Sequence, residues 1–389
     1  MTGWGFPGRF FFTEAILEKR YIKTSFQKPL FLNSASRPKS KYNMQKITIF
    51  LSFILILHCA THPTTNPNLK LANQYDEWAG FTDSDPGYKN DMELHWKKLN
   101  STNESIRAYL KLKNFNPNPD TVIYPFSGID VLNLFSFFPT SKHYILFGLE
   151  DPGFPYDYDS LTEKEKKIVK TGIKNLSEHL ANRNYFTYRK MKEETKKPEL
   201  NGAFPVFVAF LKRMGKEVVS EKEESIQGAG IIYKGWSLVL FDKKSKQTQT
   251  LTYYKIFLTG KEGVPGDGLY EYFSQFKKVG IFTKSAEYLF HGERRKNFRN
   301  LLLQNATTIV QDESGFPIRF FPNLEWDRQI FGRYERSWTL SGAVDPENQP
   351  ELKKLSESTN DPILPFPFGY GYLGTKDNRQ SAVLVFQKK

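Results

Sequence analysis

The sequence has one cysteine, Cys59, and six histidines among its 389 residues. A single cysteine cannot form a disulfide within the chain, and a metal site would have to use mainly oxygen ligands. The sequence also lacks the GxSxG, Walker, HExxH and CxxC patterns. These absences remove direct support for a serine hydrolase, a P-loop enzyme or a zinc site, and we predict no metal site.

The apolar run at residues 47–57 is too short for a membrane span, because it has 11 residues where a spanning helix needs about 20. It follows Lys46 and precedes Cys59, which is the arrangement of an export signal. We therefore predict a signal peptide at residues 44–58. Residues 1–43 precede that signal and are interpreted as a mis-assigned or disordered extension.

The segment around Cys59 resembles the lipobox of bacterial lipoproteins, in which a branched apolar residue stands three positions before a lipidated cysteine. Ile56 and Leu57 fit this pattern, whereas His58 stands where a small residue is usual. The resemblance implies that Cys59 carries the lipid; an exported protein without lipid is the alternative. Residues 59–77, rich in Pro, Thr and Asn, are predicted to be a tether, with order beginning near Trp78.

The net charge of +13 is concentrated in the segments that export would remove. Residues 1–43 carry eight Lys and Arg against two Glu, a net charge of +6, and Lys46 adds one, so 13 − 6 − 1 leaves +6 from Cys59 onward. Nucleic acid is therefore a poor candidate partner for the mature protein.

Residues 121–150 predict a strand, a turn, a helix and a second strand. The first apolar run stops at Pro125, which cannot donate a strand hydrogen bond, and Ser127 and Gly128 can turn the chain. Glu150 lies 22 positions after Gly128, close to the offset of the acidic residue in dinucleotide-binding units. Only one glycine is present where that fingerprint needs three, so the stretch does not support a dinucleotide, and the cofactor stays unknown.

The rest of the chain predicts an α/β fold with a Rossmann-like, mostly parallel sheet, flanking helices and an added antiparallel hairpin. We expect a single domain at residues 78–389, or one with an added C-terminal subdomain. The loop after Glu150 lies at the sheet edge that faces ligand in such folds. We predict helices at residues 91–112, 161–181 and 205–214, and the second of these begins with a capping box from Ser160 and Glu163. A further helix begins at Asp267 and ends at Gly280, and a short one passes through His291. Predicted strands include residues 307–311 and 317–321.

Several polar residues follow predicted strands and are candidates for a site. Lys284 and Ser285 stand at a strand-to-helix junction, where an anion can bind. His291 lies further along the same segment, and a histidine there is a helix-terminal residue, a core residue or a general base. Asp312 and Ser314 form a turn that lines a pocket or serves the fold alone.

Five stretches together resemble a family of exported bacterial lipoproteins with PFSGxD, KSAxYLxH and QDxSGxP motifs. They are PFSGIDVLNLFSFFP, YILFGLE, TKSAEYLFH, QDESGFPIRFF and LPFPFGYGY, and they cover most of residues 120–375. The resemblance brings no assigned activity, and Glu287 and Glu313 depart from the motifs. The matching polar positions are Ser127, Asp130, Glu150, Lys284, Ser285, His291, Gln311, Asp312 and Ser314.

Our leading hypothesis is a lipid-anchored envelope protein that binds a small anionic or polar molecule between residues 127–130 and 284–291. The membrane would be a partner through the N-terminal lipid. One alternative is an envelope hydrolase or transferase in which Asp130 or His291 is the base and Lys284 holds negative charge. The other is a scaffold lipoprotein without catalysis. Gly128 and Ser285 complete the set of candidate ligand contacts.

Overall fold

The computed structural model describes residues 67–82, 85–228, 230–336, 347–359, 361–370 and 381–389. The predicted extension, signal peptide and lipidated Cys59 lie outside these residues. The prediction that order begins near Trp78 is wrong, because helix α1 (Pro67–Trp78) occupies the last part of the expected tether. The rings of Tyr75 and Trp78 at the end of α1 are buried against Phe204, which explains why this segment is held to the domain.

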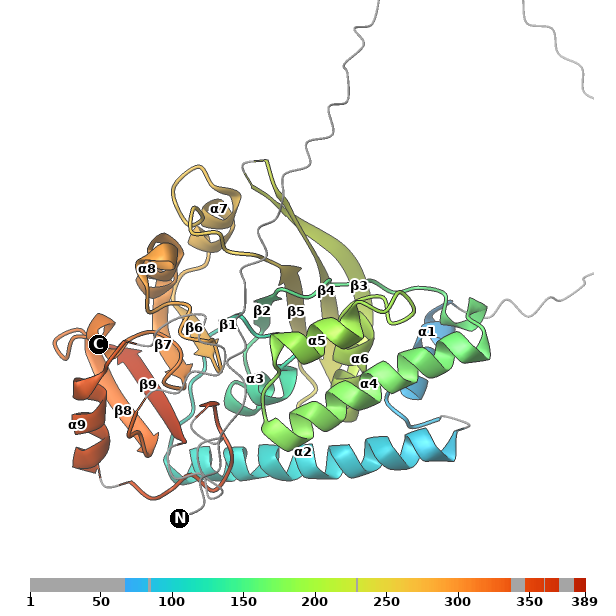
Figure 1. The fold of residues 1–389 in the computed structure, drawn as a ribbon, viewed down its shortest axis with the longest axis horizontal. Helices are drawn as coiled ribbons and strands as arrows, with labels where there is room; N and C mark the ends of the chain where they lie inside the picture. Colours follow the sequence, from blue (N-terminus) through green and yellow to red (C-terminus); the bar gives the residue numbers. More distant parts are fainter. Residues whose placement is uncertain (1–66, 83–84, 229, 337–346, 360, 371–380) are drawn as a thin grey trace, which may run out of the picture. The chain divides into compact units, whose positions relative to one another are not determined.

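One nine-stranded sheet organises the domain, and its order is β3-β4-β5-β2-β1-β6-β7-β9-β8 (Figure 1). The five central strands run parallel, and two antiparallel strands extend the sheet on each side. The predicted fold class is confirmed. The strands are β1 (Thr121–Pro125), β2 (His143–Gly148), β3 (Lys216–Gln227), β4 (Ile232–Asp242), β5 (Thr248–Lys255), β6 (Val279–Thr283), β7 (Ala306–Gln311), β8 (Trp326–Gly332) and β9 (Ala382–Lys388).

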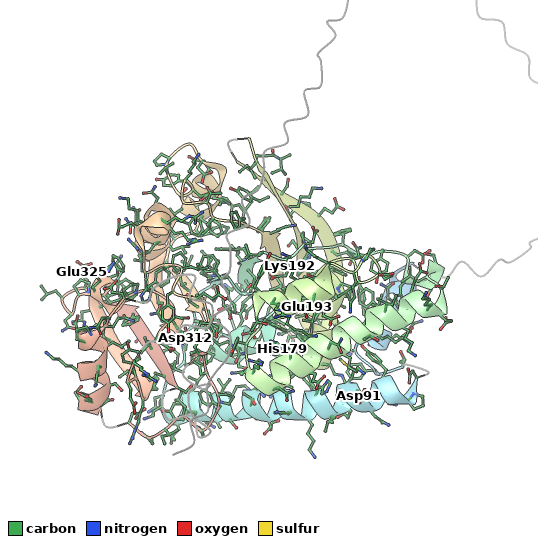
Figure 2. All side chains as sticks on the ribbon, in the orientation of Figure 1. Asp91, His179, Lys192, Glu193, Asp312 and Glu325 are labelled. Atoms are coloured by element: carbon green, nitrogen blue, oxygen red, sulfur yellow. The ribbon has the colours of Figure 1, made fainter. Side chains whose placement is uncertain are left out.

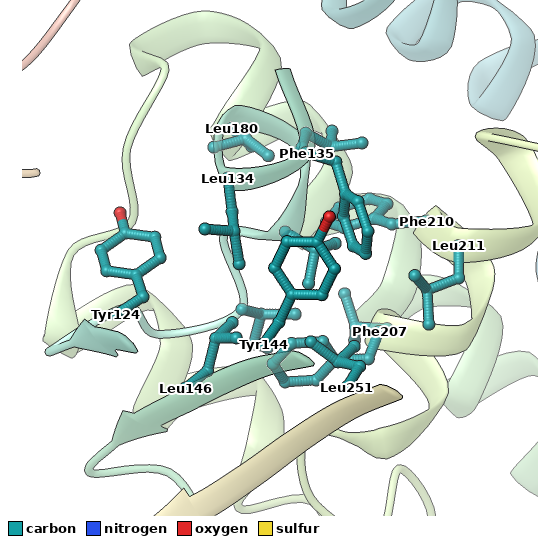
Figure 3. Close-up of a cluster of buried hydrophobic side chains, with 14 of the residues drawn as sticks. Tyr124, Leu134, Phe135, Tyr144, Leu146, Leu180, Phe207, Phe210, Leu211 and Leu251 are labelled. Carbon is teal, nitrogen blue, oxygen red and sulfur yellow. The ribbon is translucent and has the colours of Figure 1, made fainter. Parts of the chain in front are cut away.

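Both faces of the central strands are apolar because helices cover each of them. Alternate residues point to opposite faces: Val122 and Tyr124 of β1 belong to one buried cluster, whereas Ile123 belongs to the other. In the first cluster, Tyr144 of β2 packs among Phe135, Phe207 and other side chains of α3 (Val131–Phe137) and α6 (Phe204–Arg213) (Figure 3). Burial of apolar side chains on both faces explains why these runs show no polar alternation in the sequence.

The helices divide between the two faces. Helices α2 and α4 lie side by side over the first cluster, where Lys174 Nζ is 3.2 Å from a carboxylate oxygen of Asp91, labelled on α2 in Figure 2. Helices α7, α8 and α9 contribute to the second cluster. The remaining bounds are α2 (Pro86–Leu112), α3 (Val131–Phe137), α4 (Glu163–Arg183), α5 (Tyr188–Thr195), α6 (Phe204–Arg213), α7 (Gly268–Ser274), α8 (Lys296–Asn305) and α9 (Pro350–Thr359), with 3-10 turns η1 (Tyr158–Ser160), η2 (Glu293–Arg295) and η3 (Ile318–Phe320).

Several local predictions are wrong. The capping box of α4 is formed by Thr162 and Glu165, two residues later than expected, because Ser160 belongs to η1. Gly280 lies inside β6 rather than ending α7. The expected strand at residues 317–321 is the 3-10 turn η3.

The segment from Tyr288 to His291, expected to be a short helix, is an irregular turn. Ser285, Glu287 and Tyr288 have positive φ angles of 54°, 51° and 57°. These left-handed values are incompatible with a right-handed helix. The apolar spacing therefore predicts the wrong element here.

Candidate functional site

The connections that follow β1 and β6 lead in opposite directions along the sheet. After β1 the chain passes through α3 to β2 on one side, and after β6 it passes through α8 to β7 on the other side. Ligands of open α/β sheets bind outside the carboxyl ends of the strands at such a point. The loops that follow β1 and β6, which contain Asp130 and Lys284, meet here as the sequence predicted.

Asp130 and Lys284 form a buried ion pair, with 2.7 Å between Oδ2 and Nζ. The side chains are 2% and 1% exposed. Asp130 is also the N-cap of α3, since its Oδ1 accepts from the backbone N–H of Asn133 at 3.2 Å. Tyr124 donates its hydroxyl to Oδ2 at 3.2 Å, and Lys284 also donates to the carbonyl of Asn184. This pair fastens the two loops to each other.

Burial lowers the pKa of the Lys284 ammonium, and the neighbouring Asp130 carboxylate opposes that shift. Burial also raises the pKa of the Asp312 carboxyl, against hydrogen bonds from Ser314 and Ser285. Asp312 follows β7 and accepts from the Ser314 hydroxyl at 2.6 Å and from the Ser285 N–H at 3.0 Å. The predicted residues at the ends of β1, β6 and β7 are therefore brought together, but into the protein interior.

The strained turn after β6 is held by this network. The N–H of Ala286 donates to the Ser314 hydroxyl at 2.7 Å, and the Tyr370 hydroxyl donates to the carbonyl of Ser285 at 2.7 Å. The Ser285 hydroxyl itself is buried and has no hydrogen-bond partner among the described residues. Residues other than glycine keep a positive φ only where surrounding contacts impose it. The hydrogen bonds from the Ala286 N–H and from the Tyr370 hydroxyl impose it on this turn.

His291 takes part in a different set of contacts. Its Nδ1 accepts from the backbone N–H of Glu347 at 3.1 Å, and its ring packs against Tyr288. Burial lowers the pKa of His291 to about 4, so the imidazole is neutral at pH 7. Among the described residues no hydrogen bond joins His291 to Asp130 or Lys284, so the three candidates for catalysis do not form one hydrogen-bonded unit.

Three further candidates serve the local backbone. Gln311 is fully buried and exchanges two hydrogen bonds with the backbone of Phe316, at 2.8 and 2.9 Å. The Ser127 hydroxyl donates to the carbonyl of Gly128 at 2.9 Å. Gly128 has a φ of +54°, and a Cβ there would lie 2.8 Å from Met191 Sδ. Met191 therefore covers the turn where a dinucleotide would place its phosphates.

Glu150, at the end of β2, borders open space. It lines a cavity of about 480 Å³ at the carboxyl ends of β2 and β5. The Tyr253 hydroxyl donates to its Oε2 at 3.2 Å, and the side chain is otherwise enclosed, with 6% of the residue exposed. Burial raises the pKa of Glu150 to about 7. Asp151, in the loop expected to face ligand, lines the same cavity.

Four lysines line this cavity: Lys192, Lys196, Lys197 and Lys255. Lys255 Nζ is 2.9 Å from an Asp151 carboxylate oxygen, and Lys197 pairs with Glu194. Lys192, labelled in Figure 2, lies 5.3 Å from the ring centre of Tyr188, which also lines the cavity. Within the described part of the chain, no carboxylate within ion-pair distance neutralises Lys192 or Lys196.

Sequence reasoning missed Lys192, Lys196 and Lys197, because it assigned no element to residues 188–195 and the turn that follows. The available signal was the spacing of Lys192 and Lys196, four positions apart, which places them on one side of a helix. The sequence contained no indication that this helix would lie over the end of β2. That placement depends on tertiary contacts such as the packing of Met191 in the first core cluster.

We expect the free energy of unfolding to fall as pH rises from about 4.5 to about 7 through Glu150. Its folded-state pKa of about 7 lies above the ordinary 4.5, so the folded protein holds the proton more tightly than the unfolded chain does. The loss is on the order of 3 kcal/mol and is complete above pH 7. Glu150→Gln should abolish this pH dependence. In urea unfolding, the free energy of unfolding of the variant should therefore rise relative to that of the wild type between pH 5 and pH 8.

Asp151→Asn is the matched control, because that neighbouring carboxylate is 66% exposed. The difference in the free energy of unfolding between Asp151→Asn and the wild type should change little over the same pH range. A Glu150→Gln difference that is equally flat would show that burial of Glu150 does not determine its protonation.

Comparison with protein-family models finds none that matches the chain, and comparison with curated proteins finds no significant similarity. The described residues contain no group of three or more His, Cys, Asp or Glu side chains placed to hold a metal ion. No helix in the described ranges has the length and apolar character needed to cross a membrane.

Proposed function

We propose that this protein binds a small anionic molecule in the cavity at the carboxyl ends of β2 and β5. The observation that carries the proposal is the set of four lysines on the cavity wall. Two of them have no neutralising carboxylate among the described residues, so an anion would gain charge interactions without first displacing a protein group. The volume of about 480 Å³ lies in the usual range of ligand pockets.

The proposed cavity differs in place from the site expected from sequence. Asp130, Lys284 and Asp312 are at most 2% exposed and bonded to one another or to nearby backbone, so they would hold the loops at the sheet edge rather than contact the ligand. Glu150 is the predicted residue that remains a ligand contact. The enzyme alternative has weaker support than binding, because His291 lacks a bond to the other two candidates among the described residues.

We also propose that the protein acts in the bacterial cell envelope, held by a lipid on Cys59. The lipobox-like segment and the resemblance of the five stretches to motifs of exported lipoproteins support this location. Cys59→Ala should move the protein from the membrane fraction to the soluble fraction and abolish fatty-acid labelling. Unchanged labelling would contradict the assignment of Cys59.

The anion site is tested by combining Lys192→Ala with Lys196→Ala and titrating with inorganic phosphate by calorimetry. Loss of two unpaired cations should weaken phosphate binding at least tenfold, about 1.4 kcal/mol. The control combines Lys164→Ala with Lys167→Ala, since these exposed lysines on α4 give the same change in net charge outside the cavity. Equal phosphate affinity in both double variants and wild type would refute the proposed site.

A further inference from the structure

The cavity wall combines two kinds of group. Lys192 lies in α5, and Lys196 and Lys197 follow that helix. The carboxyl groups of Glu150 and Asp151 follow β2. A site built only for an oxyanion would gain nothing from two carboxyl groups, because each repels the ligand when ionised. Their presence indicates a ligand that also carries hydrogen-bond donors.

Donors of two kinds could meet these carboxyl groups, ammonium and hydroxyl. Lys255 lies in the same wall, 2.9 Å from the Asp151 carboxylate, and its charge opposes a ligand ammonium. Glu150 is enclosed beside the Tyr253 hydroxyl, where burial favours its neutral form. A neutral carboxyl suits a hydroxyl, to which it can both donate and accept, better than it suits a cation.

Asp151 can also reach a ligand at little cost. Its side chain is 66% exposed and that of Lys255 is 47% exposed, so their ion pair contributes at most about 1 kcal/mol. The cavity volume of about 480 Å³ exceeds what a bare oxyanion needs and accommodates a molecule with several functional groups. The exposed Tyr188 ring supplies apolar surface between the charged groups.

From this arrangement we infer that the ligand is a phosphorylated sugar or polyol, with its phosphate at Lys192 and Lys196 and its hydroxyls at Glu150 and Asp151. The inference rests on the proposed anion site and specifies its ligand class. Lys192 and Lys196 would supply the charge interaction, while Glu150 and Asp151 would select hydroxyl-bearing phosphates over others.

The test compares four probes by calorimetry on the full mature chain: glucose 6-phosphate, phenyl phosphate, phosphoethanolamine and inorganic phosphate. Glucose 6-phosphate should bind at least tenfold more tightly than each of the others. Phenyl phosphate has the ring size without the hydroxyls, and phosphoethanolamine replaces them by an ammonium. Equal or tighter binding of either one would overturn the inference and leave the anion site standing, whereas failure of all four probes would refute the anion site as well.

Two variants test the residues that select the hydroxyls. Glu150→Leu should bring the affinity for glucose 6-phosphate down to that for phenyl phosphate in the same titrations. Asp151→Ala, at an exposed position that does not threaten folding, should reduce the preference at least threefold. A full preference for glucose 6-phosphate in both variants would contradict the assigned roles.

The same chemical groups occur on a lipid headgroup. Vesicles that contain phosphatidylinositol therefore form a further arm, with phosphatidylcholine vesicles as the blank. Binding to the former that glucose 6-phosphate competes away supports the inference and assigns the cavity to a headgroup. Tight binding of glucose 6-phosphate without vesicle binding supports it and assigns the cavity to a soluble ligand.

Discussion

Lys284→Met is expected to lower the free energy of unfolding by about 3–5 kcal/mol, because it leaves a buried carboxylate without its cation. Asp130 and Lys284 are almost fully buried at a separation of 2.7 Å between charged atoms. Methionine keeps much of the lysine volume, so the loss reports mainly on charge and hydrogen bonding. Equilibrium unfolding in urea at pH 7 measures it.

Lys142→Met provides the matched control. Lys142 pairs with Asp120 at 3.0 Å, but the two side chains are 66% and 76% exposed. Water and mobile ions screen such a pair, and its loss should cost less than about 1 kcal/mol. If Lys284→Met cost no more than Lys142→Met, the interior pair would not fasten the loops after β1 and β6.

The same burial determines the expected effect of Asp130→Asn. At an exposed helix start, loss of the carboxylate charge would cost only about 0.3–1 kcal/mol. Asp130 instead caps α3 from within the core and faces the ammonium of Lys284. The variant should therefore lose stability whether or not Asp130 has a role in binding, and its melting temperature alone cannot separate the two roles.

One parallel pair of central strands could be predicted from local patterns. Apolar runs that stop at Pro125 and Glu150, with a turn and a helix between them, indicate a parallel pair, and β1 and β2 are such a pair. Glu150 was correctly placed at a strand end because the end of an apolar run fixes its position. Two of the added edge strands, β8 and β9, were not predicted.

The site was less predictable because its geometry depends on contacts between distant segments. The turn at Ser285 adopts positive φ through bonds to Asp312 and Tyr370, 27 and 85 positions away. Nothing in the spacing of its own apolar residues distinguishes it from a helix. The cavity likewise depends on α5 lying over the end of β2, which brings Lys192 near Glu150 only in the folded chain.

Gly153→Ala is expected to destabilise the domain by about 2–5 kcal/mol and to weaken phosphate binding in whatever fraction stays folded. Gly153 has a φ of +63°, and a Cβ there would lie 1.7 Å from the carbonyl oxygen of Asn201. The left-handed conformation costs an alanine about 1–2 kcal/mol, and overpacking adds about 1–3 kcal/mol. Asn201 and Gly202 line the cavity, so the displacement reaches the proposed site.

Gly215→Ala separates the two contributions. Gly215 has a φ of +78°, but a Cβ there would meet no atom within 4 Å, so this variant should show the conformational cost alone. The additional fall in the free energy of unfolding of Gly153→Ala then measures how closely the loop after β2 approaches the segment before α6. The hydrogen bond from the Ala203 N–H to the Asp151 carbonyl, at 2.9 Å, also holds these two segments together. Urea unfolding and phosphate titration of both variants give the comparison. If the two lost equal stability and both kept wild-type affinity, the Asn201 segment would move aside freely, and the cavity would not depend on glycine at position 153.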